Sequence, residues 1–399
     1  MRPAIWKILA FCSTSFASSN RSNLFVSSYG GEVVSLGVTD YDGRFSLEIT
    51  DSNTGCAPSP GWLTFDSTDR VLYCFDEGIL RDNGSVSSYE VSKQGALSLM
   101  ERKTIPSGPS GGVIYQTALS KVLAISHYNG SALTIWNITD QGGLSPLQEL
   151  FFYQDSPGPG PRQTGPHEHQ ILLDPTEQYL VLNAFGLDQI QIFEIDSDSG
   201  FVTELPSSPT IPGSGPRHGT FWSPYGISNK TDVSELYYFL IAEITSAFTS
   251  YRVKYKSEGG MEFQQVALTN TYGGASVPPE NGPAEIQPDN QFVVVSNRNS
   301  TPTYHTSMNP TSSVEEYWDN LMVFEPMNNG TLVRGKRVPS GGGFPRNFVF
   351  NKAGDRVAVA LQSNHRVVVF ERDVQTGEFG QILANITIQG EPNCLIWDE

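Results

Sequence analysis

The stretch PHEHQILLDPTEQYLVLNAFGLDQIQIFEID, residues 166–196, decides the fold, because the same phrase returns along the chain. It contains an apolar strand, a polar turn, a second apolar strand, a loop and a third strand in which apolar residues alternate. A unit of this kind cannot bury its apolar face alone, so its copies must stack against one another. Further copies are found at residues 109–138, 216–253, 283–326 and 345–373.

Counting the copies predicts the architecture. The last copy, PNCLIWDE, stops after one strand, whereas the chain begins with the three strands that this copy lacks, in SNLFVSSYG, EVVSLGV and RFSLEIT. Six full copies and one split copy predict an all-β, seven-bladed β-propeller, with the ring closed by N-terminal strands that complete the last blade. A pair of β-sandwiches is the alternative, but it would not explain the repeated phrase. The phrases start near Pro60, Ser110, Pro166, Pro216, Pro283, Pro345 and Pro392.

The repeat also bears on domain organisation. A length of 399 residues would by itself favour two or three domains. A closed ring has no internal linker, so residues 23–399 are expected to form one domain. Two polar inserts rich in Ser, Asn and Thr, residues 226–235 and 301–319, are interpreted as loops between strands.

The charge balance excludes several kinds of partner. The chain carries 25 Lys and Arg against 42 Asp and Glu, for a net charge of −17. No basic run exists that could neutralise phosphates, which argues against nucleic acid and anionic membranes. No segment after the N-terminus is long and apolar enough to cross a bilayer. We therefore expect a small-molecule substrate. We also expect the protein to be a monomer.

The N-terminus resembles a secretory signal. Arg2 and Lys7 precede an apolar stretch, and Ser15 and Ala17 suit a cleavage site, which predicts a signal peptide over residues 1–17. A disordered extension is the alternative. Eight Asn-x-Ser/Thr sequons favour the signal peptide and hence a secreted glycoprotein. The sequon residues are Asn20, Asn83, Asn129, Asn137, Asn229, Asn299, Asn329 and Asn385.

Four cysteines are present, and Cys12 would leave with the signal peptide. Cys56 precedes the first strand of one blade and Cys74 ends its second strand, so antiparallel pairing would bring both to one rim. A Cys56–Cys74 disulfide is therefore expected in an oxidising compartment. Cys394 would compete for that bond or remain a buried thiol. No spacing suits zinc or an iron–sulfur cluster, and we expect neither metal nor organic cofactor.

Propeller geometry selects the candidate site. The start of the first strand and the end of the second strand of each blade should meet at one mouth of the central channel. Aromatic residues Trp222 and Phe248 are also expected near this rim. The polar and aromatic candidates at these positions are His127, Tyr128, His167, His169, Arg217, His218, Glu243, Glu285, Arg298 and Arg346.

Other interpretations of these residues remain open. Arg217 and Glu243 belong to one blade, so they could form an ion pair that only ties its strands together. The histidines of PHEH could serve as general acid and base, or could only bond to neighbouring backbone. A metal site of two histidines and a glutamate has no chelating spacing to support it.

At these residues the chain resembles the lactonase-type seven-bladed propeller family, which includes 6-phosphogluconolactonase and fungal carboxy-cis,cis-muconate cyclase. The phrases that carry the resemblance are PHEHQILLDPTEQYLVLNAFG, GSGPRH, AEITSAFTSYRV, GPAEI with VVVSNR, and GGGFPRNFVFNKAGDRVAVA. For members acting on muconate-like acids, the resemblance implies a site of one His, two Arg and one Glu. Carried over motif by motif, these are His167, Arg217, Glu243 and Arg298.

This resemblance implies a cofactor-independent cyclase or lactonase that closes or opens the ring of a small organic molecule. The arginines would neutralise oxyanions, and His167 or Glu243 would move the proton. One alternative is a cyclase of secondary metabolism, including a hetero-Diels–Alder type, acting on a neutral polycyclic substrate. A second is a secreted glycoprotein that binds a ligand without catalysis, since a fold does not dictate function.

Overall fold

The computed structural model describes residues 20–41, 44–227, 233, 235–289, 291–300, 303–308 and 312–399. The predicted signal peptide, residues 1–17, and Asn229 lie outside these ranges. Within them, no helix is long and apolar enough to cross a membrane.

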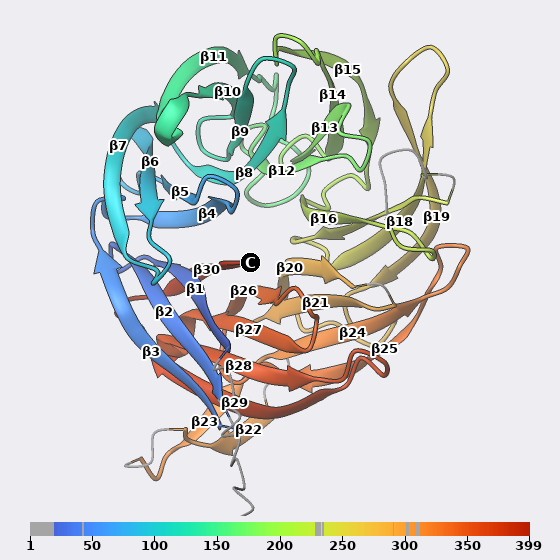
Figure 1. The fold of residues 1–399 in the computed structure, drawn as a ribbon. Coiled ribbons are helices and arrows are strands. Elements are labelled where there is room, and N and C mark those ends of the chain that lie inside the picture. The colour runs from blue at the N-terminus through green and yellow to red at the C-terminus, as the bar shows by residue number, and fades with distance from the viewer. Residues whose placement is uncertain are drawn as a thin grey trace, which may run out of the picture.

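The described residues form seven four-stranded antiparallel sheets that radiate from a central axis (Figure 1). The innermost strands are β4 (Pro60–Asp66), β8 (Pro109–Gln116), β12 (Glu168–Leu173), β16 (Pro216–Trp222), β20 (Gly282–Pro288), β26 (Pro345–Phe350) and β30 (Pro392–Trp397). Beside them run β5 (Val71–Asp76), β9 (Lys121–His127), β13 (Tyr179–Ala184), β17 (Tyr237–Ala242), β21 (Val293–Arg298), β27 (Arg356–Leu361) and β1 (Asn20–Ser28).

The two outer strands of each blade complete the sheets. The third strands are β6 (Asn83–Val91), β10 (Ala132–Ile138), β14 (Gln189–Ile195), β18 (Ala247–Tyr255), β24 (Asn320–Pro326), β28 (Arg366–Arg372) and β2 (Glu32–Tyr41). The outermost are β7 (Leu97–Pro106), β11 (Leu144–Phe151), β15 (Val202–Pro209), β19 (Met261–Asn270), β25 (Leu332–Pro339), β29 (Phe379–Thr387) and β3 (Arg44–Asn53). The predicted seven-bladed propeller is confirmed.

Ring closure also follows the prediction. The last strand, β30, pairs antiparallel with β1, so that Leu24 lies opposite Trp397 and Val26 opposite Leu395. The sheet order β3-β2-β1-β30 therefore joins the two ends of the chain in one blade (Figure 1). Because both chain ends are sealed within one sheet, no free inner edge remains at the junction.

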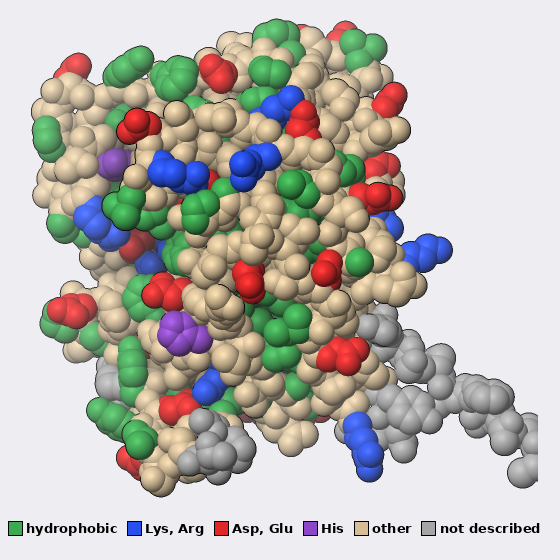
Figure 2. Space-filling view, turned by 90° about the vertical axis from the view of Figure 1, so that its left-hand side faces the viewer, with side chains coloured by type: hydrophobic (Ala, Val, Ile, Leu, Met, Phe, Trp, Pro, Cys, Tyr) green, Lys and Arg blue, Asp and Glu red, His purple; other side chains and the backbone are tan. Residues whose placement is uncertain are grey.

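The core lies between neighbouring blades. Second strands are covered on both faces, which is why they read as continuous apolar runs rather than as alternating patterns. All residues of β5, β13, β17 and β21 are buried. Between two blades, Phe248 meets Phe324 edge-on with ring centroids 4.9 Å apart. On the side of the ring shown in Figure 2, charged side chains of both signs are interspersed.

One of the two predicted loops contains regular structure. Within the insert 301–319, β22 (Thr303–Thr306) pairs with β23 (Glu315–Trp318) as a short ribbon. His305 stacks on Trp318 across this ribbon, with ring centroids 3.9 Å apart. Arg366 holds it to the last full blade through two bonds to Glu316, of 2.8 and 3.0 Å. The insert connects two strands of one sheet, β21 and β24, as predicted. The ribbon within it was not predicted, because cross-strand aromatic pairing and a bidentate ion pair outweigh the polar composition.

A disulfide joins Cys56 to Cys74, whose Cα atoms are 5.9 Å apart. Cys74 lies opposite Leu63 within β5 rather than at its end. The bond therefore fastens the segment before β4 to the middle of its blade. Cys394 is buried as a free thiol in the same apolar cluster.

Candidate active site

The register brings the predicted strand ends to one mouth of the channel. Glu168 lies opposite Ala184, Pro216 opposite Ala242, and Gly282 opposite Arg298. The starts of innermost strands and the ends of their neighbours are thus adjacent in three consecutive blades.

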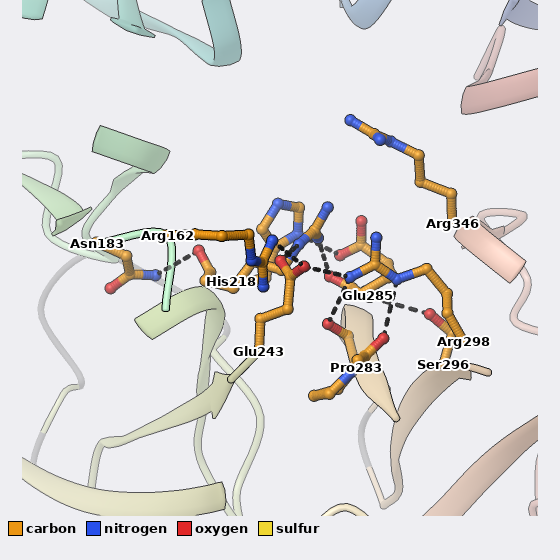
Figure 3. A network of polar contacts seen from close by, with 12 residues as sticks. Arg162, Asn183, His218, Glu243, Pro283, Glu285, Ser296, Arg298 and Arg346 are labelled. Atoms are coloured by element: carbon orange, nitrogen blue, oxygen red, sulfur yellow. Dashed lines mark hydrogen bonds and ion pairs between the residues drawn. The ribbon is translucent and has the colours of Figure 1, made fainter. Parts of the chain in front are cut away.

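At the centre of this mouth lies the carboxylate of Glu243, directly after β17. Arg217 Nε donates to its Oε2 at 2.8 Å, while Arg298 binds Oε1 at 2.9 Å and Arg162 binds Oε1 at 3.0 Å. Figure 3 shows Arg162 and Arg298 reaching Glu243 from opposite sides. Only 11% of the Glu243 side chain is exposed. Three cations around one buried carboxylate leave the cluster positively charged within an acidic protein.

Two of these arginines are fixed by backbone carbonyls of β20. Arg217 also donates through its NH1 to the carbonyl oxygen of Ala284. Arg298 donates through Nε to the carbonyl of Gly282 at 2.9 Å and lies over the ring of Phe344, 5.1 Å from its centroid. Both side chains are buried, so their guanidinium groups are held in place before any ligand arrives.

The arginines determine the protonation state of Glu243. Burial opposes the charged form, but Arg298 and Arg217 outweigh it, so the pKa of Glu243 lies well below the ordinary range. Burial lowers the pKa of Arg217 to about 9, so Arg217 remains a cation at neutral pH. A carboxylate with such a low pKa is a weak base. In the structure the carboxylate of Glu243 holds the three arginines together.

His167 stands directly before β12 at the same mouth. Its backbone adopts φ 54°, and its Nδ1 lies 2.8 Å from the carbonyl oxygen of Tyr128. Because a carbonyl only accepts, Nδ1 carries the proton, and in the neutral imidazole Nε2 is the acceptor. The hydroxyl of Thr164 lies 3.1 Å from Nε2 and donates to it.

Local packing explains why this unusual backbone is retained. The carbonyl of His167 accepts from Phe185 N at 3.0 Å, and that of Pro166 accepts from Gly186 N at 2.7 Å. A Cβ atom at Gly186 would lie 1.7 Å from the carbonyl oxygen of Gly165. Only glycine permits this close approach, which locks the PHEH segment against the end of β13.

Tyr128 connects His167 to the arginine cluster. Its ring stacks on His167 with centroids 4.4 Å apart and meets Phe185 at 5.5 Å. Phe185 in turn lies under Arg162, 5.1 Å from the guanidinium carbon. Burial raises the pKa of Tyr128 to about 12, so its hydroxyl stays protonated at neutral pH.

Below these residues, the channel floor is formed by His169, His218 and Glu285. His169 and His218 meet edge-on with centroids 5.1 Å apart, and Trp62 packs against His218 from across the channel at 5.6 Å. Glu285 accepts from His218 Nδ1 at 3.3 Å and from Asn347 Nδ2 at 2.6 Å. Burial lowers the pKa of both histidines, which are therefore neutral.

Arg346 reaches the mouth from β26. It binds Glu77 at 3.3 Å and lies over Tyr29, whose hydroxyl donates to the same carboxylate at 2.5 Å. Figure 3 shows its guanidinium group apart from the bonds around Glu243. Arg346 therefore adds positive charge at the mouth without joining the Glu243 cluster.

Three predicted substrate-binding residues lie elsewhere. His127 is buried, with its ring nitrogens 2.9 Å from Pro106 O and 2.9 Å from Thr134 Oγ1, and burial lowers its pKa to about 3. Trp222 ends β16 at the opposite rim, against Tyr237. Phe248 belongs to the core between blades. These predictions were wrong. Trp222 lies at the far end of its strand, and position along the chain does not indicate the face to which His127 and Phe248 turn.

Arg162 was missed by the sequence reasoning. It belongs to the segment between β11 and β12, rich in Pro and Gly, which lies outside the repeated phrase. Its neighbour Gln163 is buried and anchors the segment by donating to the carbonyl of Phe185 at 2.9 Å. The only available signal was a basic residue just before PHEH.

Arg162, Glu243 and Arg298 line a cavity of about 300 Å³ at the mouth. A larger cavity of about 710 Å³, lined by Asp40, Arg356 and Trp397, lies at the opposite end of the ring and does not share these groups. Among the residues that the structure describes, no cluster of three His, Cys, Asp or Glu side chains could hold a metal ion.

The chain was then compared with known proteins. Residues 18–397 match the family model described as "Lactonase, 7-bladed beta-propeller". The chain belongs to this lactonase family. A probable 6-phosphogluconolactonase from Arthroderma benhamiae is 23% identical over 378 residues, covering 94% of this chain and 88% of that protein. The 6-phosphogluconolactonase of Bacillus subtilis is 23% identical over 334 residues, covering 83% and 85%.

Solved structures show the same fold. A periplasmic gluconolactonase from Pseudomonas aeruginosa superposes with a TM-score of 0.74 at 21% sequence identity, covering 95% of this chain and 99% of that chain. At this identity the likeness concerns the fold, whereas the chemistry must be argued from the site itself.

Proposed function

We propose that this protein is a lactonase that hydrolyses the ester bond of a small cyclic substrate at the channel mouth, with His167 as general base. One observation carries the proposal: a tautomer-fixed imidazole and a Glu243-centred arginine cluster lie at the same mouth in a chain of the lactonase family. The names of the relatives, among them 6-phosphogluconolactonases, support the same class of reaction.

The proposed reaction begins with water. His167 Nε2 takes a proton from water while the water oxygen attacks the lactone carbonyl carbon. The carbonyl π electrons move to oxygen, and the guanidinium groups at the mouth stabilise the resulting oxyanion. The ring C–O bond then breaks, and His167 returns its proton to the departing alkoxide. The products are a hydroxyl and a carboxylic acid, so atoms and charges balance.

The fixed cluster suits this role because it is organised before the substrate binds. Arg217 and Arg298 keep their positions through backbone carbonyls, and Glu243 holds them together. Their positive potential is therefore in place before negative charge develops on the substrate. Burial also strengthens each electrostatic interaction relative to water.

A cyclase acting on an unsaturated acid is the second candidate. The observation that favours it is the positive mouth, to which Arg346 adds a cation outside the Glu243 cluster. Such a site would bind a carboxylate, which would then attack the alkene while His167 supplies a proton. We do not propose a neutral polycyclic substrate, because Trp222 and Phe248 lie in the core and cannot line its pocket.

Titration of released acid tests the proposal. Purified protein would be assayed at constant pH with three lactones: δ-valerolactone, glucono-1,5-lactone and a carboxylated butenolide. Acid release above the spontaneous rate from at least one lactone is expected, and Arg217→Gln should abolish it while leaving the protein folded by circular dichroism. Undiminished turnover by Arg217→Gln would contradict the mechanism. Binding of these lactones without acid release would support a non-catalytic protein instead.

A further inference from the structure

The three arginines around Glu243 are not equivalent. Arg217 and Arg298 each bond to backbone carbonyls in addition to Glu243. For Arg162, the Glu243 carboxylate is the one hydrogen-bond acceptor found within the described part of the chain. Its side chain is 55% exposed, against 3% for Arg217 and 8% for Arg298. Arg162 is therefore the member of the cluster that can change partners.

The cost of such an exchange is low. The guanidinium of Arg162 is half exposed, so water can solvate it once it leaves Glu243. Glu243 would keep its two buried partners, and those two arginines lower its pKa more than Arg162 does. The anchor of the segment is Gln163, which bonds to Gly160 N at 2.7 Å and to the carbonyl of Phe185. The guanidinium of Arg162 can therefore turn into the cavity without disturbing its backbone.

We propose that Arg162 is the catalytic arginine that donates hydrogen bonds to the oxyanion, exchanging Glu243 for the substrate as negative charge develops. Arg217 and Arg298 then act as positioning residues, which hold Glu243 and set the potential of the cavity. This assignment rests on the proposed lactonase function. No covalent bond to Arg162 forms or breaks. Its guanidinium group donates N–H hydrogen bonds to the former carbonyl oxygen after water has attacked.

Steady-state kinetics distinguish this role from simple binding. With the most active lactone of the panel, Arg162→Ala should lower kcat at least tenfold with little change in KM, because the interaction forms only in the transition state. Adding millimolar guanidinium chloride should restore part of that rate. Arg252→Ala is the matched control, because Arg252 is also half exposed and pairs with one carboxylate, Glu235, at 2.8 Å. It should show neither the loss nor the rescue.

Several results would overturn the inference. A raised KM with unchanged kcat would make Arg162 a binding residue for the ground state. Full activity of Arg162→Ala beside an inactive Arg217→Gln would leave the proposed lactonase intact and remove only the role of Arg162.

A second measurement does not depend on turnover. Methylphosphonate carries a tetrahedral anionic centre similar to the reaction's intermediate. Calorimetry should show it binding to the wild-type protein and to Arg252→Ala, and binding at least tenfold more weakly to Arg162→Ala. Equal affinity for all three proteins would contradict the inference even if no lactone in the panel proves to be a substrate.

Discussion

Glu243 is the residue that joins arginines from two blades into one cluster. Its position at a strand end could be predicted from the sequence, and so could its proximity to Arg217. Its protonation state could not be predicted, because it depends on Arg298 from another blade. The guanidinium group of Arg298 lies 2.9 Å from the Glu243 carboxylate. The sequence left open an ion pair that only ties one blade together, whereas the structure gives a cluster that spans blades.

Replacing Glu243 by Gln should destabilise the protein. The change leaves the guanidinium groups of Arg217 and Arg298 buried without a counter-charge, at a cost of about 3–5 kcal/mol in the free energy of unfolding. Denaturant titration would measure it. As a control, Glu378→Gln removes an exposed partner of Lys336 and should cost less than about 1 kcal/mol. Similar small losses of unfolding free energy in both variants would refute the role of Glu243 as the counter-charge of the buried arginines.

Glu168 gives a pH-dependent prediction. Burial raises its pKa from 4.5 to about 8, and neither carboxylate oxygen has a hydrogen-bond partner within the described residues. Between these two values the folded protein keeps a proton that the unfolded chain releases. Stability should therefore fall as pH rises through this window, by about 1.4 kcal/mol per pH unit at most, and level off above it.

Glu168→Gln should remove this dependence, since an amide does not titrate here. The melting temperature of the variant relative to the wild type should rise from about pH 5 to about pH 8. Glu262→Gln, at an exposed position of β19, is the control and should follow the wild type. A constant offset between Glu168→Gln and the wild type across this range would show that Glu168 does not keep its proton.

At the scale of elements, the repeated phrase predicted most strands, because each copy contains a buried apolar second strand bounded by turn-forming residues. It failed where the chain leaves the repeat. The β22–β23 ribbon depends on an ion pair between Arg366 and Glu316, which are far apart in the sequence. Arg162 depends equally on a segment with no copy elsewhere. Contacts of this kind carry no local pattern from which they could be predicted.

The disulfide should stabilise its blade. Cys56 and Cys74 are separated by 18 positions, and a closed loop of about that length contributes about 3 kcal/mol by restricting the unfolded chain. Replacing both cysteines by Ser should lower the melting temperature, and added reductant should then have no further effect. Cys394→Ala should leave the response to reductant unchanged, because Cys394 is a free thiol. An identical melting temperature with and without the cysteine pair would refute this prediction.

At the scale of the whole molecule, we propose a secreted glycoprotein. Five sequon residues lie exposed on the ring, namely Asn83, Asn129, Asn299, Asn329 and Asn385. Asn137 is half buried and accepts a hydrogen bond from Ser120 at 3.2 Å. After expression through a eukaryotic secretory pathway, peptide mapping should find glycans on the exposed five and little on Asn137. Unmodified protein recovered only inside the cell would contradict the proposal.

The ring also explains why residues distant in sequence share one site. Arg217 and Arg298 meet Glu243, and His167 lies at the same mouth, because radial sheets present equivalent strand ends to it. We propose that lactones are hydrolysed at this mouth with His167 as the general base.

The most direct test is the rate of lactone hydrolysis by His167→Asn, in which the new residue tolerates the left-handed backbone. We predict a fall in kcat/KM of about 100-fold or more, with wild-type activity retained by His305→Asn on the β22–β23 ribbon. Equal kcat/KM for His167→Asn and the wild-type enzyme would contradict the role of His167 as general base.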